Sequence, residues 1–202
     1  MRIQNRERPH PHGSPDRPGA GARGYGAGRG RPSPTDHRRA VSTAYYALFH
    51  SIIAAAVLRV LPASVADDED RLRASRWIQH ADIKQAATWV IRCASVTAPT
   101  DDPPKKTGVD HGVWELFSRP GPPGERVGDV PNHLRRIASA FVDLQDARHG
   151  ADYDHLLDFP KSTVRRHVNA AENALALLGA NAPDVHVQRF LALVVFRSRR
   201  LL

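Results

Sequence analysis

An uninterrupted stretch without Gly or Pro runs from Asp36 to Leu61, and it strongly constrains what the chain can fold into. Its apolar side chains recur at intervals of three and four residues, as at Tyr45, Leu48, Phe49 and Ile52. This spacing predicts a helix of about seven turns with one buried face, which Pro62 ends. Such a helix requires other elements to cover that face.

The residues before this stretch carry a helix start signal. Ser33 is suited to cap the helix, Pro34 fits its first position, and Asp36 stands where a capping-box acid is expected. Further along the same helix, Tyr46 and His50 lie four residues apart and share a second, more polar face. Tyr45 and Phe49 are expected to pack in the core against the third helix.

The rest of the chain also has helical periodicity, and we find no convincing strand. We expect a second helix over 71–95, a third from Pro131, a fourth over 162–179 and a fifth over 184–198. The predicted fold class is all-α, an antiparallel up-and-down bundle of four to five helices. The bundle should span 33–182, with 183–202 forming a C-terminal helix packed on it.

Two segments lack this periodicity. Residues 1–32 contain seven glycines and five prolines, so we expect a disordered tail. Its Arg and Gly residues suit RNA phosphate contacts, although a leader without function explains them equally well. Residues 97–130 are rich in Pro and Gly and should form a long flexible loop, which the apolar island Val113–Phe117 would pin to the bundle.

Charge and cysteine content limit the possible functions. The formal net charge is +8, but residues 1–39 and the last six residues carry the excess, which leaves 40–196 close to neutral. The basic pI of about 10.3 is therefore weak evidence for a basic binding face. The single Cys93 excludes an intramolecular disulfide. We find no apolar run of about 18 residues and no secretory signal, and so expect a cytoplasmic protein without membrane contact.

Titratable groups concentrate between Leu144 and His155. On a continuous helix, Arg148 and His155 are seven residues apart and project within about 20 degrees of each other, roughly 10 Å apart along the axis. An arginine holds phosphate oxygens in a fork, and a histidine near neutrality transfers protons. The pair therefore suits proton transfer at a bound phosphate, a chemistry that needs no metal. Gly150 is a possible break in that helix.

Two stretches of the sequence, RRAVSTAYYALFH at 38–50 and ARHGADYDH at 147–155, resemble HEPN domains, the helical bundles of bacterial toxins, RNases and nucleotidyltransferase partners. The resemblance implies a homodimer that binds RNA or nucleotide, with metal-independent RNase activity of toxin-antitoxin or defence type and a nucleotidyltransferase-type antitoxin as a partner. It implies Arg148 and His155 as catalytic residues. The candidate RNA- or nucleotide-binding residues are His149, Tyr153, Tyr46 and His50.

Structural roles are the alternative for each of these residues. Arg148 can pair with Asp146 or Asp152, and His155 can be a solvated histidine after a helix. The tyrosines can be core aromatics, and His50 and His80 either satisfied bundle histidines or, with Lys84, a small anion pocket. The chain would then be a non-catalytic dimerisation or partner-binding module. No metal-binding spacing such as H-E-x-x-H and no phosphate-binding glycine loop occurs, so we expect neither a metal nor a cofactor.

Overall fold

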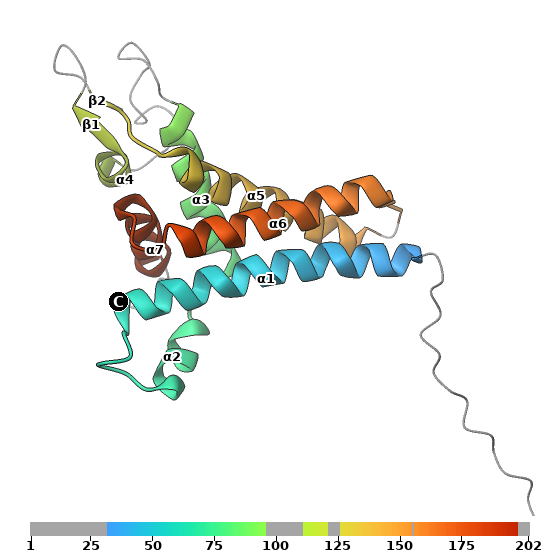
Figure 1. Ribbon diagram of the computed structural model, residues 1–202, viewed down its shortest axis with the longest axis horizontal. Coiled ribbons are helices and arrows are strands. Elements are labelled where there is room, and N and C mark those ends of the chain that lie inside the picture. Colours follow the sequence, from blue (N-terminus) through green and yellow to red (C-terminus); the bar gives the residue numbers. More distant parts are fainter. Residues whose placement is uncertain (1–31, 96–110, 121–125, 155, 198–202) are drawn as a thin grey trace, which may run out of the picture. The chain divides into compact units, whose positions relative to one another are not determined.

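The computed structural model describes residues 32–95, 111–120, 126–154 and 156–197, and this part of the chain is mostly helical (Figure 1). The all-α prediction is confirmed at this level, with seven helices and one small sheet in the described ranges. The helices are α1 (Pro34–Val60), α2 (Asp68–Ser75), α3 (His80–Ser95), α4 (His111–Leu116), α5 (Asn132–Tyr153), α6 (Lys161–Ala180) and α7 (Val185–Arg197), and the strands are β1 (Ser118–Pro120) and β2 (Arg126–Gly128).

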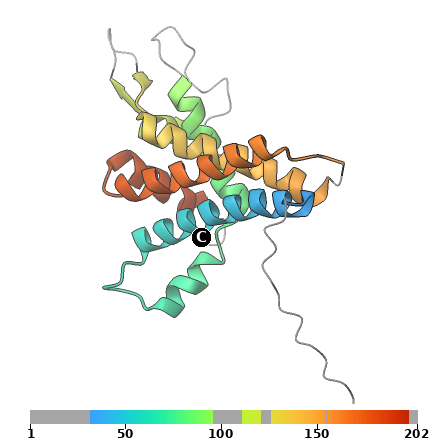
Figure 2. The same cartoon turned by 45° about the vertical axis from the view of Figure 1, so that its right-hand side comes forward.

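Three long helices form the centre of the fold. Helices α1 and α6 lie side by side and run in the same direction, and α5 runs in the opposite direction against both (Figures 1 and 2). Helix α3 packs on α5, and α7 packs on α1 and α3. The chain reaches this arrangement because each of these helices has an apolar stripe that the others cover.

The core contains the apolar stripe of α1, as the sequence predicts. Tyr45, Leu48 and Ile52 are almost fully buried. The ring of Tyr45 lies 5.6 Å from that of Phe141 on α5, which confirms the prediction that Tyr45 packs against the third of the expected helices. Phe49 is also buried. The first helix therefore serves mainly as a scaffold on this face.

Side-chain caps fix the starts of α1 and α7. Asp36 N donates to Ser33 Oγ at 3.2 Å and Ser33 N donates to Asp36 Oδ2 at 2.9 Å, so the predicted capping box is present. At α7, the carboxylate of Asp184 accepts hydrogen bonds from the backbone of His186 and Val187. These caps satisfy amide groups that have no partner within a helix. They explain why α1 and α7 begin close to the predicted positions.

The single helix predicted over 71–95 is wrong, because α2 and α3 are separate. Asp82 accepts a hydrogen bond from Gln79 N at 3.0 Å, which caps a new helix start where no Gly or Pro marks a break. The intervening Ile78 is buried, so the interruption places one more side chain in the core. A local cap and tertiary packing together outweigh the helical propensity of this segment.

The predicted loop over 97–130 contains secondary structure, so the expectation of one long flexible loop without strands is corrected. Strands β1 and β2 pair antiparallel, with Arg119 opposite Val127. Trp114 and Phe117 are buried, which confirms that the apolar island anchors this segment. Arg189 of α7 donates to the Leu116 carbonyl at 2.9 Å. Residues 96–110 and 121–125, and the predicted tail except residue 32, lie outside the described residues.

The hydropathy of α1 contradicts the expectation that the chain contains no apolar run of about 18 residues. By length and composition it is apolar enough to cross a membrane, with a mean hydropathy of 1.6 over its most apolar 18 residues, whereas the sequence analysis found no such run. Half of that window is buried inside the bundle. The core helix of a soluble protein passes the same test, so this helix is weak evidence for a membrane span.

Candidate functional site

The two segments that resemble HEPN domains lie against each other. Along α1, Arg38, Ser42 and Tyr46 follow at intervals of four residues and therefore share one face. Each makes a hydrogen bond to the C-terminal end of α5 or to the residues just after it. Because the two helices are antiparallel, residues later in α1 contact residues earlier in α5. We refer to these three α1 residues and their partners as the α1–α5 ladder.

Arg38 forms the first step of the ladder. Its Nη1 donates to the carbonyls of Ala151 at 3.0 Å and Asp154 at 2.8 Å, and Nη2 donates to the Leu157 carbonyl. The last carbonyls of a helix have no partner within it, and they carry a partial negative charge. A guanidinium at this place therefore fixes the end of α5 and the turn that follows it.

Asp152 connects the next two steps. Ser42 Oγ donates to its Oδ1 at 2.7 Å, and its Oδ2 lies 2.6 Å from Arg148 Nε. The second contact is an ion pair without the alignment of a hydrogen bond, since Arg148 Nε has no hydrogen-bond partner among the described residues. This pairing is the structural alternative that the sequence analysis gave for Arg148, with Asp152 rather than Asp146 as the partner.

Arg148 is held from several sides. Its Nη2 donates to the Tyr46 hydroxyl at 2.8 Å, and its Cζ lies 5.4 Å from the ring centre of Tyr46 and 5.6 Å from that of Tyr153. Burial disfavours its charge, but Asp152 and the two tyrosines outweigh that effect and raise the pKa of Arg148. The side chain is 20% exposed, so a fixed cation reaches the surface between two aromatic rings.

The geometry predicted for Arg148 and His155 does not apply. Helix α5 continues through Gly150, contrary to the possible break there, but it ends at Tyr153 with Asp154 as its C-cap. The continuous helix on which that geometry depends is therefore not present, because α5 ends before position 155. A Cβ on Gly150 would lie 2.6 Å from Leu157 Cδ2, so the glycine allows the following turn to fold back closely. His155 itself lies outside the described residues.

Two candidate binding residues form an exposed aromatic pair at the end of α5. Tyr153 is 64% exposed, His149 is exposed as well, and their ring centres are 4.9 Å apart. An aromatic side chain with this exposure gains little from burial. The structure brings together three of the four candidate binding residues around Arg148: Tyr153, His149 and Tyr46.

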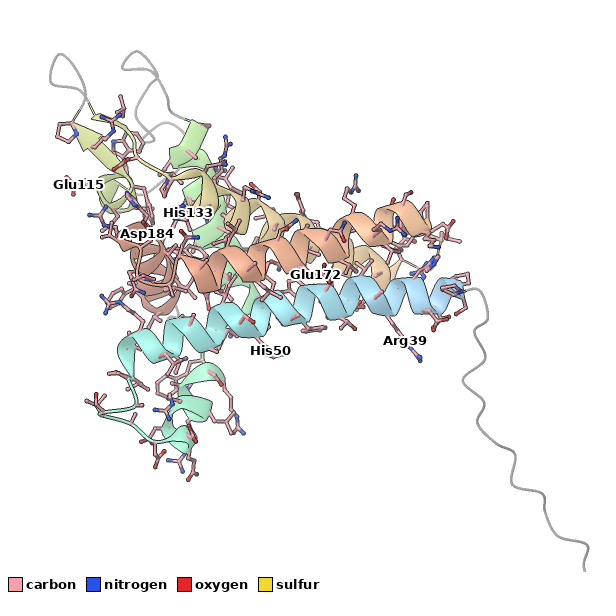
Figure 3. All side chains as sticks on the ribbon, viewed as in Figure 1. Arg39, His50, Glu115, His133, Glu172 and Asp184 are labelled. Atoms are coloured by element: carbon pink, nitrogen blue, oxygen red, sulfur yellow. The ribbon has the colours of Figure 1, made fainter. Side chains whose placement is uncertain are left out.

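The fourth candidate, His50, lies one turn further along α1, with its ring stacked 6.0 Å from that of Tyr46 (labelled in Figure 3). His80 of α3 lies 6.1 Å from the Tyr46 ring, stacks on Phe49 at 3.9 Å and contacts the Tyr45 hydroxyl through Nδ1. Burial raises the pKa of Tyr45, so its hydroxyl keeps its proton. The tautomer of His80 decides which of the two groups donates in this contact.

His80 is held in its neutral form. Burial lowers its pKa, and the nearby charges of Arg148 and His50 lower it further. The anion pocket considered for His50, His80 and Lys84 is not supported, because Lys84 Nζ pairs with Asp146 Oδ1. A neutral imidazole beside a fixed guanidinium is able to accept or donate a hydrogen bond to a bound ligand.

Two ladder residues escaped the sequence reasoning. Arg38 and Ser42 were quoted only as part of a motif, although their spacing of four from each other and from Tyr46 places all three on one helix face. That spacing was the available signal. Among the described residues, no group of three or more His, Cys, Asp or Glu side chains is placed to hold a metal ion.

Comparisons with known proteins leave the family open. No family model matches the chain, and the searches of curated proteins and of solved structures return no significant match.

Proposed function

We propose that this chain is a HEPN-like helical bundle that binds RNA or a nucleotide at the surface around Arg148. The observation that carries the proposal is the position of Arg148 between the rings of Tyr46 and Tyr153. A cation that is held in place next to exposed aromatic rings suits a ligand that combines a phosphate with a base. Homodimerisation, a nucleotidyltransferase-type antitoxin and a cytoplasmic location belong to the same proposal.

The α1–α5 ladder supports the family part of the proposal. The two segments that resemble HEPN domains are about 100 residues apart in sequence, yet Arg38, Ser42 and Tyr46 bond to the second segment at every step. A motif whose parts serve one contact network is more informative than two separate resemblances. The network also explains why polar residues occupy one face of an otherwise apolar helix.

The chemistry of the site favours binding. Nη2 and Nε of Arg148 are engaged, whereas Nη1 has no hydrogen-bond partner within the described residues and is not enclosed. It is free to donate to a phosphate oxygen. The exposed pair of Tyr153 and His149 offers a stacking surface for one base. Binding of this kind needs no rearrangement of the ladder.

Metal-independent RNA cleavage is the second candidate. It is favoured by the two histidines near Arg148, since the rings of His50 and His80 lie 6.0 and 6.1 Å from that of Tyr46. Histidines supply the acid and the base that transesterification requires, and His155, two residues after Tyr153, is the catalytic partner that the family resemblance implies. The opposite alternative, a partner-binding module without catalysis, is favoured by the engagement of Arg148 with Asp152.

Replacement of Tyr153 by alanine tests the binding proposal, because this ring is too exposed to be needed for the core. We expect Tyr153→Ala to weaken binding of a short single-stranded RNA about tenfold, the typical cost of one lost stacking contact. Fluorescence anisotropy with the full chain measures this. Leu156→Ala is the matched control, since Leu156 is 96% exposed and lies on the same turn. Equal affinities of the two variants would overturn the stacking role.

Cleavage is measured with the same RNA in the presence of EDTA. If the chain is an RNase, Arg148→Lys and His155→Ala should both abolish product formation while circular dichroism shows intact helices. If the parent protein binds this RNA without cleaving it, the binding proposal stands and RNA cleavage is excluded for that RNA. Absence of both binding and cleavage would favour the partner-binding module.

A further inference from the structure

A second polar surface lies between α5 and α6, in a groove of about 1050 Å³. Five cations line it, and Asp143 is the only acid among its lining residues. The cations are Arg135, Arg136, Lys161, Arg165 and Arg166. We call this surface the α5–α6 groove. Its charge is unexpected from the sequence, because residues 40–196 are close to neutral as a whole.

The cations of the groove are largely unpaired. Arg135 donates to Asn132 Oδ1 at 2.9 Å. The side chains of Arg136, Lys161, Arg165 and Arg166 make no hydrogen bond or ion pair with any described residue, and all four residues are exposed. Like charges gathered without counter-ions repel one another and raise the free energy of the folded protein. A ligand with several negative charges would relieve that repulsion.

The groove is separate from the site around Arg148. None of its lining residues contacts Arg148, whose partners come from α1 and from the end of α5. The two surfaces also differ in chemistry, because no aromatic side chain lines the groove. Its remaining polar groups are the hydroxyls of Ser139 and Ser162 and the amides of Asn169 and Asn173. Such groups hydrogen-bond to phosphate and sugar oxygens without reading the bases.

The dimensions of the groove fit a polymer better than a small anion. The lining residues of α6 extend from Lys161 to Leu177, which is about 24 Å at 1.5 Å per residue. Charges spread over this length match a chain of phosphates, and a basic groove that follows a backbone is the usual device for single strands. The apolar lining consists of three alanines and Leu177, so the groove offers a peptide few apolar anchor sites.

A second copy of this chain is a poor occupant. A two-fold interface sets the same patch against itself, so five cations would meet five cations across it. We propose that the α5–α6 groove binds the phosphodiester backbone of a single-stranded nucleic acid, which is RNA under the function proposed above, on which this inference rests. The groove contributes affinity that is strongly dependent on salt and weakly dependent on sequence, and the Arg148 site adds contacts to a base.

The test is the salt dependence of oligonucleotide binding by the full chain. The triple variant Arg136→Gln, Arg165→Gln and Arg166→Gln removes three exposed cations from the groove. The matched control removes three exposed cations elsewhere, through Arg39→Gln, Arg59→Gln and Arg76→Gln. In Figure 3, Arg39 projects from the edge of α1 opposite α6. Both triples keep the arginines of residues 1–32, so their contribution cancels.

We expect the groove triple to reduce the slope of log K against log salt by about 2, because each phosphate contact to a single strand contributes about 0.7. Affinity at about 0.1 M salt should fall tenfold or more, whereas the control triple should stay within about twofold of the parent. The groove triple should weaken the binding of RNA and of DNA with the same sequence to the same extent, because the groove contacts phosphates. Urea unfolding and circular dichroism verify that both triples are folded.

Other results separate the two proposals. Equal slopes for the groove triple and the control triple would overturn the groove, while Tyr153→Ala still tests the Arg148 site on its own. Binding of DNA but not RNA, with the slope change intact, would keep the groove and overturn the RNA function. If the parent binds polyglutamate but no oligonucleotide, the groove is a docking site for an acidic protein and our assignment is wrong.

Discussion

The Arg148 site and the α5–α6 groove both present arginines from α5, but the two regions differ in what those arginines contact. Arg148 has Asp152 and Tyr46 as partners and is 20% exposed. Arg136, Arg165 and Arg166 are exposed and have no partner within the described residues. The charge of Arg148 joins two helices, whereas the charges of the groove remain exposed to solvent.

This difference separates charge that stabilises the fold from charge that is available to a ligand. Substitution of a partly buried cation leaves its partners unsatisfied and lowers the stability of the fold. Substitution of an exposed cation costs little stability. A shared motif therefore does not by itself identify a binding residue: Arg148 belongs to a motif and stabilises the fold, and the groove residues belong to none. Substitution experiments measure how far each region serves stability.

Removal of Arg148 should have the largest effect on stability. Arg148→Met leaves the carboxylate of Asp152 and the hydroxyl of Tyr46 without their partner, so we expect a loss of about 2 kcal/mol in the free energy of unfolding. Arg165→Met, the matched change in the groove, should cost less than about 0.5 kcal/mol. Urea unfolding of both variants compares them. Similar losses would mean that the groove cations are structural after all.

The ion pair itself should contribute less than the whole network. A double-mutant cycle with Arg148→Met and Asp152→Ala should give a coupling of about 1 kcal/mol, because the two side chains are only 20% and 29% exposed. The pair of Glu69 and Arg73 has the same spacing of four and the same separation of 2.6 Å, but it is 69% and 63% exposed. Its coupling should be about 0.4 kcal/mol.

The order of the two residues sharpens this comparison. Glu69 precedes Arg73, which is the more favourable order along a helix, whereas Arg148 precedes Asp152. If burial decides the strength, the Arg148 pair is stronger despite its unfavourable order. A larger coupling for Glu69 and Arg73 would show that helix geometry decides instead, and Asp152 would then contribute mainly through Ser42.

The structure was predicted best from the sequence where interactions between nearby residues determine it. The capping box of Ser33 and Asp36 and the buried stripe of Tyr45 follow from spacing alone, and both are present. The break before α3 was not predicted, because it depends on a hydrogen bond from Gln79 to Asp82 and on a core that accepts Ile78. Strands β1 and β2 are only three residues long, too short for an alternating pattern.

The site was predictable only in part, for a similar reason. Sequence reasoning named Arg148, Tyr46 and Tyr153, and also gave Asp152 as a possible partner of Arg148, but spacing alone does not decide between binding and pairing. The α5–α6 groove was missed because charge was summed along the chain, and Asp and Glu elsewhere cancel it. Cations on two separate helices form one surface only after the helices pack together.

The smallest expected effect concerns pH, and it compares one histidine next to each region. Burial lowers the pKa of His80 and of His167, and a neighbouring arginine lowers each further, Arg148 for His80 and Arg166 for His167. Since each folded pKa lies below the unfolded value of 6.5, the unfolded chain binds more protons between the two values. Stability from these histidines is present above pH 6.5 and is lost as the pH falls.

Urea unfolding at pH 7.5 and pH 5.5 measures this loss. His80→Gln and His167→Gln should each lose less stability on acidification than the parent does, and Gln keeps an acceptor for the Tyr45 hydroxyl. Arg148→Met should reduce the loss through His80, because the fixed guanidinium lies close to that ring. Arg166→Gln should have the weaker effect, since that side chain is solvated and Asp143 already opposes it at His167. An equal response of the two arginine variants would show that the Arg148 charge is screened as well as the groove charge, and the two regions would then differ in partners alone.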